Sequence, residues 1–106
     1  MELNEYQTKA RQTAIYPFEF AVIYPTLGLA GEAGEVAEKV KKVIRDNCGK
    51  FDSNDLIIKE LGDVLWYLAN LAEDLGTTLD HVAEVNIAKL ADRAERNKLQ
   101  GSGDRR

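Results

Sequence analysis

The sequence predicts an all-α protein, a helical bundle of three to four main helices. Only two of its 106 residues are proline, Pro17 and Pro25, and both lie in the first quarter of the chain. After Pro25, apolar residues recur at three- and four-residue steps, which is the period of one helix face. Short polar or glycine-containing stretches separate these periodic segments, as in bundles with short loops. The length suits one domain and is too short for two, so residues 1–106 are predicted as a single domain.

The first quarter of the chain is the least regular part. A modest helix is expected over 3–14, with Tyr6 and Ala10 on one side. Residues 15–24 are mixed and aromatic, and they predict an irregular connection with room for one short helical turn. Their aromatic side chains are expected to pack rather than to recognise a base: Tyr16, Phe18, Phe20 and Tyr24.

Three longer helical segments are expected downstream. Pro25 suits the first position of a helix over 25–45, where its missing N–H has no intrahelical partner, and Gly49 is predicted as a left-handed cap. The next helix, 54–75, is expected to begin at a capping Ser, Asn or Asp and to end at Gly76. A 4-3 spacing suited to near-parallel packing is formed by Ile57, Leu61, Val64, Leu68, Leu71 and Leu75.

A last helix is predicted over 79–97, and Thr77 or Thr78 is expected to restart the chain just before it. From Arg93 to the end, five basic residues stand against two acidic ones, so 93–106 is expected to be a basic, partly flexible tail. Several helices carry apolar residues on more than one side, and so few helices make a small core for a monomer.

Composition argues against several classes of protein. The formal net charge of −4 is the opposite of the basic footprint of nucleic-acid binding. No apolar run approaches the roughly 20 residues that cross a bilayer, and the first residues lack the pattern of a signal peptide. The single Cys48 forms no internal disulfide and makes a cysteine-built zinc site improbable. A cytoplasmic location, without nucleic-acid or membrane partners, is therefore expected.

Two pairs of acids stand out: Glu32 with Glu35, and Glu60 with Asp63. Each pair has i, i+3 spacing, which places two carboxylates on one helix face about a turn apart. If the two helices lie side by side, four carboxylates converge. Like charges about 4 Å apart repel by about 4 kcal/mol at an effective dielectric of about 20. Such a cluster requires protons, basic side chains or bound cations.

The surroundings of these acids allow two interpretations. A polar stripe lies one residue's rotation from the apolar seam, and it is either a solvated flank or the mouth of an interhelical groove. Gly31, Gly34 and Gly62 favour the groove, because a glycine inside a helix costs up to about 1 kcal/mol relative to alanine. They indicate close approach of backbone or ligand, or else a tight helix crossing on a face shared with Gly28. The stripe consists of Glu60, Asp63, Tyr67, Asn70 and Asp74.

Four carboxylates without a histidine among them predict a hard cation, magnesium or manganese. Magnesium retains several waters and binds through a few carboxylates together with substrate phosphates. This combination suits polyphosphate hydrolysis, in which the metal offsets charge on the reacting oxygens and orients a water.

The two acid pairs lie in the runs LGLAGEAGEV (27–36) and KELGDVLWY (59–67). These runs resemble the MazG-like all-α nucleoside triphosphate pyrophosphohydrolases, whose pattern is Glu-x-x-Glu, a spacer, and Glu-x-x-Asp. The resemblance extends to NIAKLADR (86–93) and to the GSGDR ending (101–105). It implies magnesium-dependent hydrolysis of (d)NTP to (d)NMP and pyrophosphate, with manganese as a substitute, in dimers or in tetramers built from dimers. Removal of aberrant nucleotides from the pool is one role that such an activity serves.

The resemblance also implies individual roles. The acidic residues Glu32, Glu35, Glu60 and Asp63 would bind the metal and form the catalytic set. Glu38 adds a carboxylate one turn further on, as a ligand, a water-orienting base or a bystander. Trp66 either stacks a base or packs in the core. The substrate would be contacted by Lys89, Arg93, Asn86, Tyr67 and the tail with Arg105, which closes over the phosphates.

Two other interpretations stay open. The chain could be a non-catalytic helical oligomerisation or interaction module whose acids simply form a solvated flank. Alternatively, the fold is the same and the substrate is another pyrophosphate-linked compound.

Overall fold

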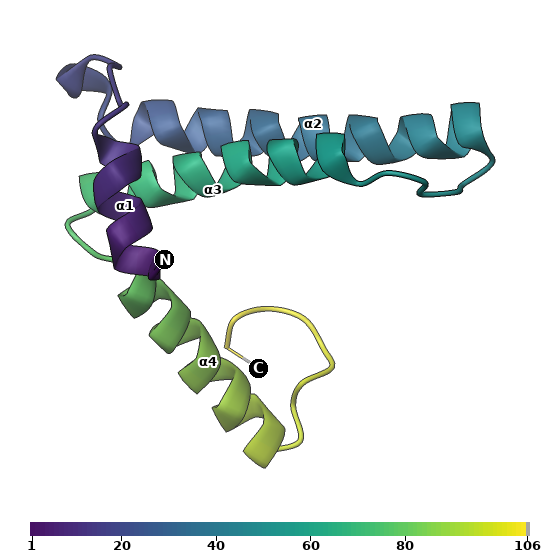
Figure 1. The fold of residues 1–106 in the computed structure, drawn as a ribbon. Helices are drawn as coiled ribbons and strands as arrows, with labels where there is room; N and C mark the ends of the chain where they lie inside the picture. Colours follow the sequence, from purple (N-terminus) through teal and green to yellow (C-terminus); the bar gives the residue numbers. More distant parts are fainter. Residues whose placement is uncertain (106) are drawn as a thin grey trace.

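Four α-helices and one short 3₁₀ turn form the part of the chain from residue 1 to residue 105 (Figure 1). The computed structural model describes residues 1–105, and that part contains no β-strand, which confirms the all-α prediction. Arg106, the last residue of the predicted tail, lies outside the described residues. The elements are α1 (Leu3–Arg11), η1 (Phe18–Phe20), α2 (Ile23–Asn47), α3 (Asp55–Asp74) and α4 (Leu79–Glu95).

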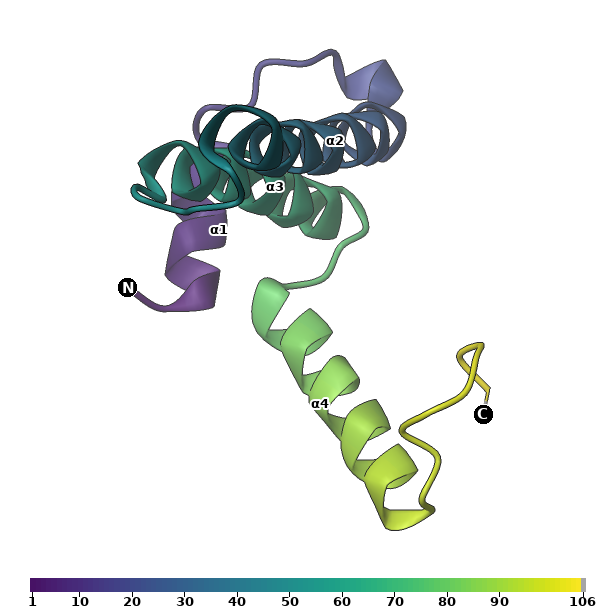
Figure 2. The same ribbon diagram turned by 90° about the vertical axis from the view of Figure 1, so that its right-hand side faces the viewer.

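The helices α2 and α3 form a long antiparallel hairpin (Figure 1). The helix α1 crosses the end of the hairpin where α2 begins and α3 ends, and α4 leaves from the same end and runs away from it (Figures 1 and 2). The chain after α4 turns back alongside that helix. At the far end of the hairpin Gly49 is left-handed as predicted, with φ of 77°, and Cys48 before it shares this conformation with φ of 53°.

Several helix boundaries differ from the prediction by one to three residues. The first helix ends at Arg11 rather than at residue 14. Just after this end, the hydroxyl and the N–H of Thr13 both donate to the carbonyl of Ala10. The second begins at Ile23, so Pro25 lies inside the first turn, where its missing N–H still breaks no helical bond. The last helix ends at Glu95, two residues early.

The junction of α3 and α4 is closed by local hydrogen bonds. Gly76 is left-handed with φ of 73°, and the N–H groups of Gly76 and Thr77 donate back to Glu73 and Ala72. This is a Schellman cap, for which glycine is the favoured residue. Thr78 then caps α4 by accepting the N–H of His81 at 3.1 Å. Both punctuation signals in the sequence are confirmed.

The buried core is small and lies where α1, α3 and the start of α4 meet. It consists of Ala10, Ala69, Ala72 and Leu79, with Tyr6, Leu65 and Trp66 packed against it. The predicted seam of α3 is divided, because α1 and α2 cover only one side of this helix. Its first, third and fifth members are half-buried, whereas Leu61, Leu68 and Leu75 are 51%, 37% and 61% exposed.

The apolar stripe of α4 is likewise uncovered. Val82, Val85 and Ile87 are 46%, 52% and 65% exposed, since beyond its first turn α4 runs away from α1, α2 and α3. Within residues 1–105, no helix combines the length and the apolar character that crossing a membrane requires.

Candidate active site

Three of the predicted acids converge between α2 and α3. Glu32 from α2 and Glu60 and Asp63 from α3 each offer one carboxylate oxygen, and these oxygens all lie within 4.8 Å of one another. The i, i+3 spacing puts the two α3 acids on one face, and the antiparallel hairpin brings Glu32 opposite them. Within residues 1–105, none of the three forms an ion pair with a basic side chain.

The surroundings of the cluster disfavour the charged form of Glu32. The pKa of Glu32 is raised above its ordinary value by partial burial first, and then by the neighbouring Asp63, Glu60 and Glu35 carboxylates. A bound cation would reverse this penalty. The donor set contains only carboxylate oxygens, which fits a hard cation such as magnesium or manganese. The chain's one histidine, His81, lies in the first turn of α4 and is absent from the cluster.

The remaining acids of α2 occupy different positions. Glu35 is exposed, one turn beyond Glu32, and is not among the three converging groups, although its charge contributes to the raised pKa of Glu32. Glu38 pairs with Lys41 at 3.0 Å, and that ammonium lowers the pKa of the Glu38 carboxyl. The structure therefore brings three of the four predicted metal ligands together and leaves Glu38 in a surface ion pair.

An open cleft of about 380 Å³ lies beside the acids. Its size falls in the range of small-ligand sites, roughly 300–1,000 Å³. The cleft thus joins carboxylates to aromatic and hydroxyl groups, which is a different setting from a uniformly solvated flank. It is lined by Thr13, Glu32, Asp63, Trp66 and Tyr67.

Four aromatic rings form one continuous group at this cleft, which we term the aromatic wall: Tyr16, Tyr24, Trp66 and Tyr67. The rings of Tyr16 and Tyr24 stack with centroids 4.8 Å apart, and Trp66 meets Tyr67 edge-on at 4.9 Å. Tyr16 meets Trp66 edge-on at 6.5 Å. The indole N–H of Trp66 donates to the hydroxyl of Thr13 at 2.7 Å. Trp66 therefore packs against the core and also lines the cleft, and stacking of a base on its ring stays a prediction.

Only one of the helical glycines is explained by packing within the chain. A Cβ on Gly28 would lie 2.1 Å from a ring carbon of Tyr67, so this glycine makes room for the aromatic wall. At Gly31, Gly34 and Gly62, no atom of residues 1–105 approaches an added Cβ within 4 Å. The close approach expected from the sequence thus occurs one turn earlier, at the glycine that we had assigned only to the helix-crossing face.

The glycine difference gives a matched stability test. Gly28→Ala should destabilise the protein by about 1–3 kcal/mol, because the Tyr67 ring must leave its place. Gly31→Ala, on the same helix with open space, should be stabilising by up to about 1 kcal/mol. Urea denaturation followed by circular dichroism measures both, and equal shifts in the same direction would refute this account of Gly28.

The raised pKa of Glu32 predicts a pH-dependent stability. A carboxyl that binds its proton more tightly in the folded state loses stabilising free energy as pH rises from its ordinary value of 4.5 through the raised one. Charged Glu32 therefore costs stability at pH 7 in the absence of metal. Glu32→Gln should raise the metal-free unfolding free energy at pH 7 by about 0.2–1 kcal/mol, with no gain at pH 4.

Denaturation at the two pH values checks this, with Glu95→Gln at the exposed end of α4 as the matched substitution. A Glu32→Gln protein that is less stable at pH 7 would show that the carboxylate is compensated in the free protein.

The predicted substrate-binding cations lie on α4, away from the acids of the same chain (Figures 1 and 2). Lys89 pairs with Asp104 of the returning tail at 3.1 Å. Arg93 is 4% exposed, and its guanidinium donates to the carbonyl of Asp104 at 2.8 Å. These two cations lower the pKa of the Asp104 carboxyl. Asn86 on α4 and Arg105 in the tail are exposed.

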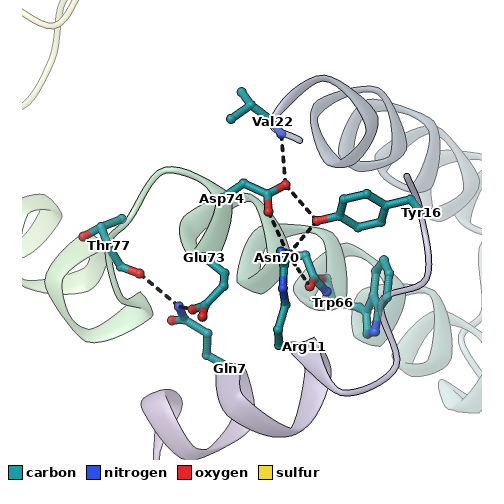
Figure 3. Close-up of polar contacts among 9 residues, drawn as sticks. All are labelled: Gln7, Arg11, Tyr16, Val22, Trp66, Asn70, Glu73, Asp74 and Thr77. Carbon is teal, nitrogen blue, oxygen red and sulfur yellow. Dashed lines mark hydrogen bonds and ion pairs between the residues drawn. The ribbon is translucent and has the colours of Figure 1, made fainter. Parts of the chain in front are cut away.

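Two residues near the site, Asp74 and Tyr6, make interactions that the sequence did not predict. The buried carboxylate of Asp74 accepts hydrogen bonds from Arg11, Tyr16 and the N–H of Val22 (Figure 3). Asp74 was part of the predicted polar stripe, but its partners lie more than 50 residues upstream, and no spacing rule connects them. Tyr6, which is predicted on the packed side of the first helix, also lies within electrostatic reach of the site. Burial first, and then the charge of Asp63, raise the pKa of Tyr6.

Comparison with known proteins agrees with this arrangement. Residues 25–97 match the family described as the MazG nucleotide pyrophosphohydrolase domain. The chain is also similar to the Gene 37 protein of Mycobacterium phage L5, with 45% identity over 114 aligned positions that cover all of both chains. No solved structure matches it significantly. Because the family match spans well over half of the chain and includes all three converging carboxylates, the chain belongs to the MazG nucleotide pyrophosphohydrolase domain family.

Proposed function

We propose that the protein is a magnesium-dependent nucleoside triphosphate pyrophosphohydrolase that converts (d)NTP to (d)NMP and pyrophosphate. The observation that carries this proposal is the convergence of Glu32, Glu60 and Asp63, uncompensated by basic groups, at a cleft in a chain of this family. Three carboxylates within 4.8 Å of one another, without basic partners, favour a cation site over a solvated acidic flank.

The three carboxylates would hold the metal, and Glu35 would add a fourth acidic group at the exposed edge of the cluster. When bound, a divalent cation supplies charge neutralisation on the phosphate oxygens and an activated water. The protein's part is to fix the carboxylates on two packed helices, so that little reorganisation is needed when charge develops on the phosphates. Manganese would replace magnesium, since both prefer oxygen ligands.

The nucleoside half of the substrate would lie against the aromatic wall. Trp66 and Tyr67 line the same cleft as Glu32 and Asp63, so a base on these rings leaves its phosphates directed to the acids. Stacking of a base on an aromatic side chain contributes about 1–3 kcal/mol and tolerates different bases. Wide acceptance of bases would suit removal of aberrant nucleotides.

Lys89, Arg93 and Asn86 are proposed to contact phosphate or sugar. Since α4 runs away from the acids of its own chain, this contact requires α4 from a second copy. Phosphate oxygens would exchange for the Asp104 carboxylate, which pairs with both cations in the single chain. The basic tail carrying Arg105 would then close over the phosphates.

Homo-oligomerisation is therefore part of the proposal, as a dimer or tetramer. The radius of gyration is 16.6 Å, whereas a compact chain of this length has about 13 Å. The accessible surface is 7792 Å², against about 5,900 Å² for a folded monomer of this mass. The excess is close to the area that one partner loses in a large obligate interface, roughly 1,000–2,500 Å². The uncovered stripes of α3 and α4 supply apolar area of that kind.

Product analysis tests the activity. Purified protein with magnesium and a panel of canonical, deoxy and damaged triphosphates should release monophosphate and pyrophosphate, resolved by ³¹P NMR. Release of diphosphate and orthophosphate would place cleavage at the other anhydride and contradict the proposal. A protein without turnover on any of these, and without a thermal shift from magnesium and nucleotide together, would favour the interaction-module interpretation.

A further inference from the structure

The carboxylate of Asp74, at the end of α3, ties three segments together. Its side chain is 1% exposed. One oxygen accepts from the Arg11 guanidinium at 2.7 Å, and the other accepts from the Tyr16 hydroxyl at 2.7 Å and from the N–H of Val22 at 2.9 Å (Figure 3). Asp74 thus joins α1, the connector (residues 12–22) and the start of α2.

The charge of Asp74 is well compensated. Burial by itself would raise the pKa of this carboxyl, but the Val22 N–H, the Tyr16 hydroxyl and the Arg11 guanidinium together hold it below its ordinary value. Asn70, which is fully buried at 0% exposure, extends the network: its oxygen accepts from Arg11 and its amide donates to the Trp66 carbonyl. A buried charge with this many donors is an anchor that fixes their positions.

The connector requires such an anchor at Val22. This residue has φ of 69° and ψ of −50°, and the Ile23 N–H donates to the Ala21 carbonyl across it. The geometry is a γ-turn of the strained hand, which is rare for a β-branched residue and costs roughly 1–3 kcal/mol. Asp74 accepts the N–H of this same residue, so its hydrogen bond offsets part of that cost.

The anchored connector contributes Thr13 to the cleft and Tyr16 to the aromatic wall. Tyr16 stacks on Tyr24 and meets Trp66 edge-on, and Thr13 accepts the indole N–H of Trp66. Asp74 itself does not line the cleft. Any influence of Asp74 on a ligand must therefore be indirect, through the connector and the aromatic wall.

We infer that Asp74 is a positioning residue that sets the aromatic wall for the nucleoside half of the substrate. This inference rests on the proposed function for its ligand, and on the contacts of Asp74 for its mechanism. Because Glu32, Glu60 and Asp63 are held by the α2–α3 hairpin and not by the connector, loss of the anchor should change KM and leave kcat nearly unaltered. The phosphate end of the site should be unaffected.

A plain structural role, fastening α1 to α3, is the competing explanation, and the neighbouring residue provides the control. Glu73 accepts from the Gln7 side chain at 2.7 Å, so it also fastens α1 to α3, yet this hydrogen bond does not involve the connector (Figure 3). Glu73→Gln and Asp74→Asn make the same chemical change at adjacent positions. Only the second breaks a contact with the connector.

The experiment uses the chain's single tryptophan, Trp66, as a reporter inside the wall. Asp74→Asn should move Trp66 emission to longer wavelength and raise KM for the nucleotide by about tenfold, the loss typical of one hydrogen bond to a charged group. It should leave kcat within about twofold, because the hairpin still holds the acids. For the same reason, the affinity for inorganic pyrophosphate with magnesium should also change by no more than about twofold. Glu73→Gln should change none of these readouts.

Equal changes in the two variants, or a fall in kcat with KM unaltered, would overturn the positioning role. If Asp74→Asn does not fold, Tyr16→Phe keeps the ring and removes the two hydrogen bonds of its hydroxyl, the one donated to Asp74 and the one accepted from Arg11. It should then give a smaller shift in emission and KM in the same direction, and unchanged values would overturn the inference. If the native protein hydrolyses no nucleotide, the proposed function fails, while Trp66 emission still decides whether Asp74 fixes the wall.

Discussion

Asp63→Asn should lower kcat for pyrophosphate release by about 10²–10³-fold or more, because it removes one of the three converging carboxylates without changing the size of the side chain. The helical circular dichroism spectrum should be unchanged, since Asp63 is exposed and forms no ion pair within residues 1–105. Steady-state assays of pyrophosphate release at saturating magnesium measure the effect.

The matched control is Asp46→Asn. This aspartate lies near the far end of α2 and pairs with Arg45 on the surface, so its loss should leave kcat within about twofold. Full activity in Asp63→Asn would remove the acidic cluster from the mechanism. A comparable loss in Asp46→Asn would indicate a general effect of charge rather than a metal site.

Leu68→Glu should convert the assembled protein into a smaller species and lower its stability substantially. In a single chain Leu68 is 37% exposed on the uncovered side of α3, where a glutamate would be tolerated. In the proposed oligomer the same position is covered, and burying an unpaired charge there costs several kcal/mol. Size-exclusion chromatography with light scattering measures the mass, and thermal denaturation measures the stability.

Ile15→Glu is the comparison for this prediction. Ile15 is 94% exposed on the connector, outside the uncovered stripes of α3 and α4, so its replacement should leave the mass unchanged. A native protein that is monomeric at micromolar concentration, with Leu68→Glu equally monomeric and equally stable, would contradict oligomerisation through this face of α3.

The helices and the acid cluster were predictable because they depend on short-range rules. Apolar periodicity predicts the long helices, and Gly76 and Thr78 mark the end of α3 and the start of α4. The i, i+3 spacing places Glu60 and Asp63 on one face of α3. Side-by-side packing of α2 and α3 was an assumption at that point, and the structure confirms it. The convergence of Glu32 with the two α3 acids follows from that packing.

The unpredicted features depend on contacts between distant parts of the chain. The Asp74 carboxylate accepts a hydrogen bond from Arg11, 63 residues away in the sequence, and no local pattern pairs these two residues. Gly28 was less conspicuous than Gly31 and Gly34 because it adjoins no acid, yet the Tyr67 ring that fills its space comes from another helix. The division of the α3 seam into covered and exposed halves was also hidden, since periodicity shows which residues are apolar and not what covers them.

The proposed function requires that Glu32, Glu60 and Asp63 together hold a divalent cation at the nucleotide cleft. The most direct measurement is a crystal structure of the protein with manganese and a non-hydrolysable nucleoside triphosphate, with the metal located by anomalous scattering. We expect an anomalous peak bonded to oxygens of these three carboxylates and to the nucleotide phosphates. A bound nucleotide with manganese elsewhere, or a cleft in which the three carboxylates bind no metal, would contradict the account.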